Sequence, residues 1–179
     1  LVRVNVREAR GVRSAAENAT VRVIAQQDMT PELARVSANN YRQTGKETVF
    51  TLDPIRLENG KNVSGVNTGN RLIIQANNIR YSPEQLSDHE MMHDFIREDP
   101  GMKSAIRKAI QDRYDRKQFS DIVDAYIKRH REVYTGADQN TLRELAVEEL
   151  FCDAFAGMNK FSQHAERYQE TVRGTYAER

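Results

Sequence analysis

The chain lacks most of the features that mark disulfide-stabilised, membrane-bound or nucleic-acid-binding proteins. It has a single cysteine, Cys152, so no disulfide can form within the chain. No apolar run approaches the length of about eighteen residues that a membrane helix needs, and no signal peptide is visible. The net charge is only +1, because 27 basic residues nearly balance 26 acidic ones. The composition therefore gives no electrostatic reason to expect nucleic acid or an anionic membrane as a partner.

Length and composition instead suit a soluble globular protein. The 179 residues are enough for one domain with its own core. We predict an arm or linker over residues 1–19 and a single domain over residues 20–179. The chain begins with Leu1 rather than Met, which is compatible with a piece of a longer protein. We expect a bacterial or phage-associated cytoplasmic location, and the alternative is delivery or secretion as part of a longer protein. The oligomeric state is not indicated.

The first half of the domain is predicted to form a small, mostly antiparallel sheet with one helix packed on it. Alternating or β-branched runs predict strands at residues 20–24, 47–52 and 71–75, with turns around one short strand at residues 53–70. Thr30 followed by Pro31 is a helix start signal. Gly45 is placed to end the helix that we predict over residues 31–43.

The second half is predicted to be helical, which makes the fold class α+β. Ser82-Pro83-Glu84-Gln85 fits a capping box and opens a helix that should end before Asp99-Pro100. Apolar periodicity and turn residues predict four more helices, which begin near Met102, Ser120, Thr141 and Ser162. The last three should end at Gly136, Gly157 and Arg173.

Two of the four histidines lie in the first of these helices, within the segment His89-Glu90-Met91-Met92-His93. Residues four apart share one face of a helix, and two imidazoles so placed can bind one zinc ion at about 2.0–2.1 Å. Glu90 lies about 100° around the helix from His89. It can therefore act as a general base on water without binding the metal itself.

A catalytic zinc needs a third protein ligand and one open position. Glu149 lies in an apolar helical stretch, on the face that also carries Leu145 and Cys152, where an unpaired carboxylate is unfavourable. A bound metal would remove that conflict. Glu148 is the alternative ligand, and Asp153 can accept a hydrogen bond from a ligating imidazole. The plain alternative is that both glutamates lie on a solvated face and Asp153 pairs with an arginine.

These residues carry a family resemblance over residues 20–157. The HExxH segment followed by helical Glu149-x-x-x-Asp153 resembles the gluzincin branch of the zincin metallopeptidases. The string from Glu149 to Ala156 is similar to a segment of ImmA/IrrE-type metallopeptidases, with Cys152 where alanine is usual. Residues 94–148 depart from that family, because they are longer than is usual there and contain two inserted helices. Related domains occur in large phage and mobile-element proteins.

The resemblance implies a zincin-like fold and a zinc-dependent metallopeptidase, an endopeptidase rather than an exopeptidase, that acts on a protein or peptide. Zn²⁺ would be held by His89, His93 and Glu149, with Glu90 as the general base and Asp153 supporting a ligating imidazole. Zincins also bind substrate as an added strand on a sheet edge. That edge is predicted to consist of Leu72, Ile73, Ile74 and Gln75.

Other residues near the motif are given plainer roles. Met91 and Met92 are predicted to pack in the core, and Cys152 to be an inert buried thiol. Asp88 and Asp94 are interpreted as acids on a solvated helix face. A Tyr or His that stabilises the oxyanion is usual in such sites, and we choose none of the candidates, which are Tyr126, His130, Tyr134, His164 and Tyr168.

Two alternative functions come from different classes. The first is an HD-type metal-dependent phosphohydrolase that uses His89, His93, Asp94 and Asp153. Its fold is all-helical, so the predicted strands and the presence of Glu90 count against it. The second is a zincin-like domain that binds a partner protein without catalysis, which the intact Glu90 disfavours.

Overall fold

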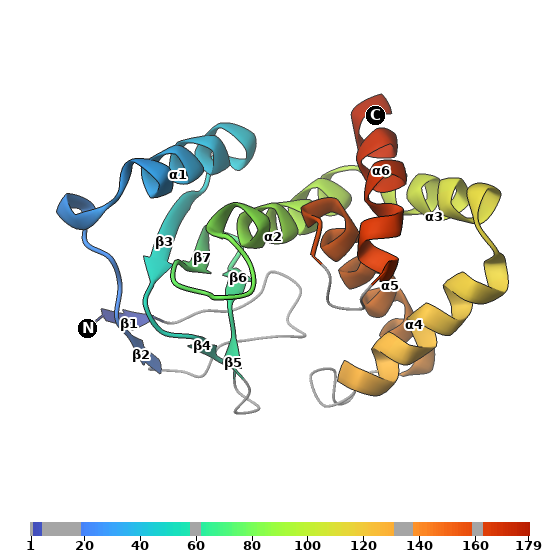
Figure 1. Ribbon diagram of the computed structural model, residues 1–179, viewed down its shortest axis with the longest axis horizontal. Coiled ribbons are helices and arrows are strands. Elements are labelled where there is room, and N and C mark those ends of the chain that lie inside the picture. Colours follow the sequence, from blue (N-terminus) through green and yellow to red (C-terminus); the bar gives the residue numbers. More distant parts are fainter. Residues whose placement is uncertain (1, 5–18, 58–61, 131–137, 159–162) are drawn as a thin grey trace. The chain divides into compact units, whose positions relative to one another are not determined.

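The computed structural model describes residues 2–4, 19–57, 62–130, 138–158 and 163–179 (Figure 1). The chain forms two compact units, Leu1–Met91 and Met92–Arg179. Of the predicted arm, Val2–Val4 forms strand β1, and residues 5–18 lie outside the described residues. The prediction of one domain over residues 20–179 stays a prediction.

The first unit is built around a three-stranded sheet of β3, β7 and β6, in that order. Its strands are Glu47–Thr51 (β3), Gly65–Asn67 (β6) and Arg71–Gln75 (β7). β3 runs parallel to β7, and β6 runs antiparallel to it. Two antiparallel ribbons accompany the sheet, β1 with β2 (Ala19–Val21) and β4 (Ile55–Arg56) with β5 (Asn62–Val63). The α+β class and the mostly antiparallel pairing are confirmed, but residues 53–70 contain three short strands rather than one.

The strand β7 is the centre of this sheet. Leu72, Ile73 and Ile74 are each 0% exposed, and β7 pairs with β3 on one side and β6 on the other. A run of apolar residues without alternation is the pattern of a strand buried on both faces. The prediction that Leu72, Ile73, Ile74 and Gln75 form an edge strand is therefore wrong, and the edges of the described sheet are β3 and β6.

Helix α1 (Pro31–Thr44) lies beside β3 (Figure 1) and has the predicted caps at both ends. The Thr30 hydroxyl accepts a hydrogen bond from the Leu33 amide at 3.2 Å. Gly45 follows the helix in the left-handed conformation, with φ of 70°. A residue with a Cβ is strained in that region, which explains why glycine ends the helix.

A buried amide ties three elements of this unit together. Asn40 of α1 is 1% exposed. Its side-chain nitrogen donates to the Thr48 hydroxyl of β3 at 3.0 Å and to the Ser87 hydroxyl of helix α2 (Pro83–Glu98) at 2.9 Å. Directional bonds of this kind fix the helix that carries the HExxH segment against the sheet.

The predicted capping box of α2 is confirmed. The Gln85 amide donates to the Ser82 hydroxyl at 3.1 Å, and the Ser82 amide donates to the Gln85 side-chain oxygen at 3.1 Å. The helix ends at Glu98, directly before Asp99-Pro100. Since proline disfavours helical backbone at the residue before it, the end point follows from the sequence.

The second unit is helical. It contains the end of α2 together with α3 (Met102–Arg113), α4 (Arg116–His130), α5 (Gln139–Ala156) and α6 (Gln163–Glu178). Helix α5 packs against α4 and α6, and α6 also packs against α3 (Figure 1). Within the described residues, no helix is both long enough and apolar enough to cross a membrane.

Two of these helices begin earlier than predicted, because aspartates cap them. The Asp115 carboxylate accepts from the Lys117 amide at 2.7 Å, so α4 starts at Arg116 rather than near Ser120. Asp138, not Thr141, caps α5, since its carboxylate accepts from the Thr141 amide at 2.8 Å. Helix α6 continues to Glu178, beyond its predicted end. The predicted end of α4 at Gly136 lies outside the described residues.

Two glycine-to-alanine substitutions should change stability in opposite directions. Gly45 has positive φ, and Gly174 lies inside α6; an added Cβ at either position would meet nothing within 4 Å. Gly45→Ala should lower the free energy of unfolding by about 1 kcal/mol through backbone strain. Gly174→Ala should raise it by about 0.5–1 kcal/mol, because alanine is the better helix former. Urea denaturation of both variants measures the two shifts, and shifts of the same sign would contradict this prediction.

Candidate metal centre

Helix α2 carries both histidines and Glu90 on buried positions. His89, Glu90 and His93 are 3%, 4% and 8% exposed. The two methionines between them, Met91 and Met92, are 2% and 0% exposed, so their predicted place in the core is confirmed. Ionisable groups are rarely buried unless they are paired or bind a ligand.

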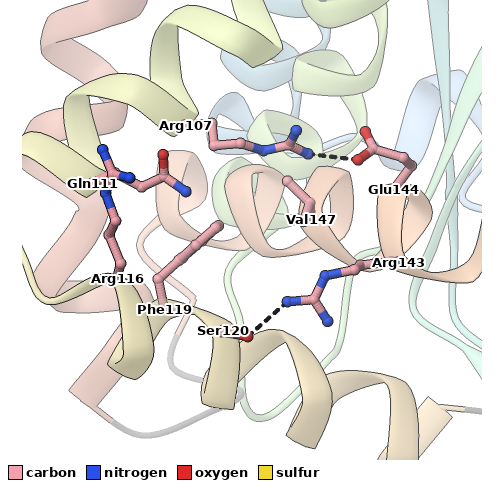
Figure 2. Close-up of a pocket in the computed structure, with 8 residues that line it drawn as sticks. All are labelled: Arg107, Gln111, Arg116, Phe119, Ser120, Arg143, Glu144 and Val147. Atoms are coloured by element: carbon pink, nitrogen blue, oxygen red, sulfur yellow. Dashed lines mark hydrogen bonds and ion pairs between the residues drawn. The ribbon is translucent and has the colours of Figure 1, made fainter. Parts of the chain in front are cut away.

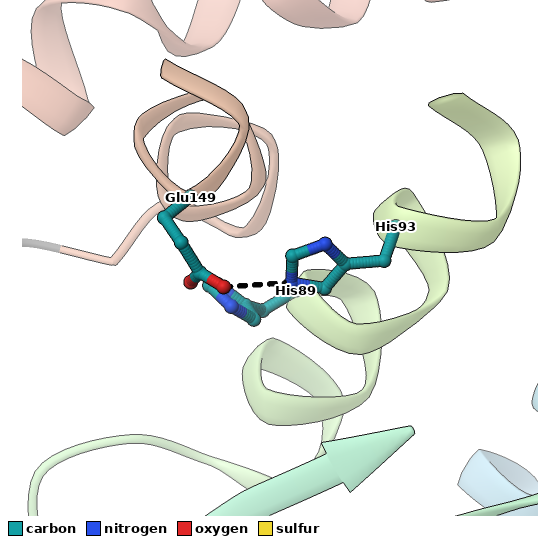
Figure 3. Close-up of side chains that lie close together, drawn as sticks. All are labelled: His89, His93 and Glu149. Atoms are coloured by element: carbon teal, nitrogen blue, oxygen red, sulfur yellow. Dashed lines mark ion pairs between the residues drawn. The ribbon is translucent and has the colours of Figure 1, made fainter. Parts of the chain in front are cut away.

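Helix α5 supplies a carboxylate to the two histidines. Single ligand atoms of His89, His93 and Glu149 all lie within 4.8 Å of one another (Figure 3). Within this group, His93 Nε2 lies 3.1 Å from Glu149 Oε1. Three buried side chains that converge in this way can hold one metal ion, and two imidazoles with one carboxylate are a donor set that zinc accepts.

The acidic residues of α5 are buried rather than solvated. Glu148, Glu149 and Asp153 are 2%, 4% and 0% exposed. The alternative that the two glutamates form a solvated helix face is therefore wrong. The apolar residues that surround them on α5 explain the burial, since every residue from Ala146 to Ala156 is buried.

Glu148 makes a contact that the sequence analysis did not assign. Its Oε2 lies 2.8 Å from His93 Nδ1. Both nitrogens of the His93 ring therefore face carboxylates, and these belong to consecutive residues of α5. Support of a ligating imidazole was predicted for Asp153, and for Asp153 this stays a prediction. The sequence feature that could have indicated this contact is the pair of adjacent glutamates in an otherwise apolar stretch.

The surroundings of His93 favour positive charge. Burial by itself would lower the pKa of the His93 imidazole. Cys152 and the two glutamates nevertheless hold that pKa well above its ordinary value, because they stabilise the charged ring. Carboxylates that are buried beside imidazoles favour a cation between them for the same electrostatic reason.

Glu90 lies beside the converging ligands without being one of them. Its Oε1 is 4.0 Å from His89 Nε2. Its backbone carbonyl accepts a hydrogen bond from the Asn67 side chain of β6 at 3.1 Å. A Cβ built on Gly65 of β6 would lie 3.4 Å from Glu90 Cγ and from Oε1. Asn67 and Gly65 therefore place strand β6 in contact with Glu90.

Cys152 is a buried core thiol that we expect to be unreactive at neutral pH. It is 0% exposed, and burial raises the pKa of its thiol to about 12. The thiolate is the reactive form, so we predict that native protein resists aromatic disulfide reagents and that urea-unfolded protein reacts with one equivalent. Absorbance of the released thiolate follows the reaction. Rapid modification of the native protein would show that Cys152 is accessible.

The tyrosines, histidines and aspartates named as other candidates differ in their burial. Tyr126 and Tyr168 are buried, Tyr168 against Tyr114 and Phe119. Asp94 is 1% exposed and pairs with Arg97, so the prediction of a solvated acid is wrong there. Asp88 is half-buried. Tyr134 and the side chains of His130 and His164 lie outside the described residues.

A cavity of about 290 Å³ lies elsewhere in the second unit (Figure 2). The residues that line it are Arg107, Gln111, Arg116, Phe119, Ser120, Arg143, Glu144 and Val147. Arg107 donates to Glu144 at 2.7 Å, and Arg143 donates to the Ser120 hydroxyl at 2.9 Å. At about 100° per residue, Val147 lies on the side of α5 opposite Glu149. The cavity is therefore separate from the converging metal ligands.

Comparison with known proteins adds no family assignment. No protein-family model, curated protein or solved structure matches this chain. We therefore infer the function from the chemistry of the buried residues of α2 and α5.

Proposed function

We propose that this protein is a zinc-dependent metallopeptidase of the zincin type that cleaves internal peptide bonds. The observation that carries the proposal is the convergence of His89, His93 and Glu149 within 4.8 Å, all three buried. Glu90, adjacent to His89 and outside the ligand set, supports a hydrolytic role over a purely structural metal site. A structural zinc site uses four protein ligands, whereas a catalytic one keeps a position open.

The roles of the residues follow from their chemistry. His89, His93 and Glu149 would hold the ion. Bound zinc lowers the pKa of a water molecule and polarises the scissile carbonyl. Glu90 then accepts the proton from the attacking water and delivers it to the leaving amine. Burial of Glu90 strengthens its interaction with the developing charges, because the surroundings screen them poorly.

The two alternatives are less well supported. An HD-type phosphohydrolase is all-helical, whereas this chain contains the β3-β7-β6 sheet beside α2. A binding domain without catalysis would not need a buried carboxylate at Glu90, which is 4% exposed. Release of phosphate from nucleotides without peptide cleavage would favour the first alternative.

Cleavage of a denatured proteome tests the proposal without a known substrate. The protein is stripped with a chelator, reloaded with zinc and incubated with the proteome, and new peptide N-termini are mapped by mass spectrometry. We expect new internal N-termini with zinc and none with the stripped protein. Zinc-loaded protein that produces no new N-termini, while the same sample releases phosphate from nucleotides, would contradict a peptidase.

A further inference from the structure

The imidazole of His93 is held between two consecutive residues of α5. Its Nδ1 lies 2.8 Å from Glu148 Oε2, and its Nε2 lies 3.1 Å from Glu149 Oε1. All three side chains are buried. Neighbouring residues on a helix point about 100° apart. Both glutamates contact the His93 ring because the ring lies between the direction in which the Glu148 side chain leaves the helix and the direction of the Glu149 side chain.

The two contacts give the two nitrogens of the His93 ring different roles. An ionised carboxylate accepts hydrogen bonds and donates none, so Nδ1 carries the proton that it donates to Glu148. A histidine that binds a metal is neutral, and in that form the lone pair of the ring would be on Nε2, the atom that faces Glu149. Glu149, and not Glu148, belongs to the group whose ligand atoms converge with His89. We infer that Glu148 is the positioning residue of the metal centre, which fixes the tautomer and orientation of His93.

This inference rests on the proposed metal centre and deepens it. Burial of a carboxylate costs free energy. Glu148 is nevertheless buried, and the apolar residues Val147 and Leu150 flank the pair of glutamates on α5. An apolar side chain would fill the same space more favourably if packing were its only role. A carboxylate that holds the distal nitrogen of a ligating histidine also raises the basicity of the ligand. Its effect should therefore appear in metal affinity.

The test compares Glu148→Gln with Glu149→Gln in zinc titrations against a chelating indicator of known affinity. Glutamine can still accept from Nδ1 through its amide oxygen, but it lacks the negative charge. Glu148→Gln should bind one zinc per chain with an affinity about ten- to hundredfold weaker. Glu149→Gln, which removes a ligand, should lose more. Glu144→Gln is the matched control, because Glu144 lies on the same helix and its side chain is 51% exposed.

A second readout separates positioning from a general structural role. Long-range ¹H–¹⁵N spectra of the zinc-loaded protein should show the His93 proton on Nδ1. In Glu148→Ala the proton should lose its fixed place or shift its resonance, while the far-UV circular dichroism stays unchanged. Zinc affinity of Glu148→Gln within twofold of the original would overturn the inference. So would a Glu148→Gln protein that binds no zinc beside a Glu149→Gln protein that does, because Glu148 would then be the ligand.

Failure of the inference differs from failure of the proposed function. If the unmodified protein binds no zinc, the metal centre itself is wrong. If it binds zinc and cleaves peptides, and Glu148→Gln does the same with unchanged affinity, only the role of Glu148 is wrong.

Discussion

Glu90→Gln is expected to lower the rate of peptide hydrolysis by about 10²–10⁴-fold, the usual contribution of a positioned general base. The substitution keeps the size of the side chain and its contact with Gly65, where a Cβ would lie 3.4 Å from Glu90 Cγ. It removes the basic carboxylate. Because Glu90 is outside the ligand set, zinc should remain bound at one ion per chain. The rate is measured with a cleaved peptide identified from the proteome, at saturating zinc.

Glu98→Gln is the matched control for this result, since Glu98 is an exposed residue at the end of the same helix. Its hydrolysis rate should equal that of the unmodified protein. Full activity in Glu90→Gln would show that Glu90 is not the base. If the Glu90→Gln protein keeps both its zinc and its biological effect, the domain acts by binding alone.

Glu149→Ala is expected to remove most of the stabilisation that zinc gives to the fold. A ligand that binds only the native state stabilises it by about 2.7 kcal/mol at a concentration of one hundred times its Kd. Without the Glu149 carboxylate, only the two imidazoles of α2 would remain as protein ligands. Thermal unfolding with and without zinc, at equal protein concentration, measures the difference. The unmodified protein should show a clear zinc-dependent rise in Tm, and the variant little or none.

Glu144→Ala separates this effect from a general weakening of α5. Glu144 lies on the same helix, where it pairs with Lys103 and Arg107. Removal of these two partly exposed ion pairs should lower stability by only about 1 kcal/mol and leave the zinc-dependent rise in place. An equal zinc-dependent rise in Glu149→Ala would exclude Glu149 as a ligand.

Features set by neighbours in the sequence were predictable. The capping box at Ser82 and Gln85, the cap at Thr30 and the stop at Gly45 all depend on contacts within a few residues. The shared face of His89 and His93 follows from the helical repeat alone. The burial of Glu149 was also predictable, because the residues around it on the helix are apolar.

Features set by distant contacts were not predictable. The middle position of β7 depends on which strands pair with it, and β3 is far from it in sequence. The parallel pairing of those strands has no local signature. The same limit applies to Glu148, whose contact with His93 joins residues 55 apart. The aspartate caps of α4 and α5 are a different case, because Asp115 and Asp138 are local signals. The predicted helix starts followed the apolar periodicity instead and were therefore too late in the chain.

The most direct test of the account is the zinc K-edge absorption spectrum of the purified, zinc-loaded protein, taken with its metal content. We expect one zinc per chain in a shell of nitrogen and oxygen at about 2.0–2.1 Å, with the scattering pattern of two imidazoles. We expect no sulfur at about 2.3 Å, because Cys152 is not among the converging ligands. Less than one zinc per chain, a sulfur shell, or fewer than two imidazoles would contradict the site formed by His89, His93 and Glu149.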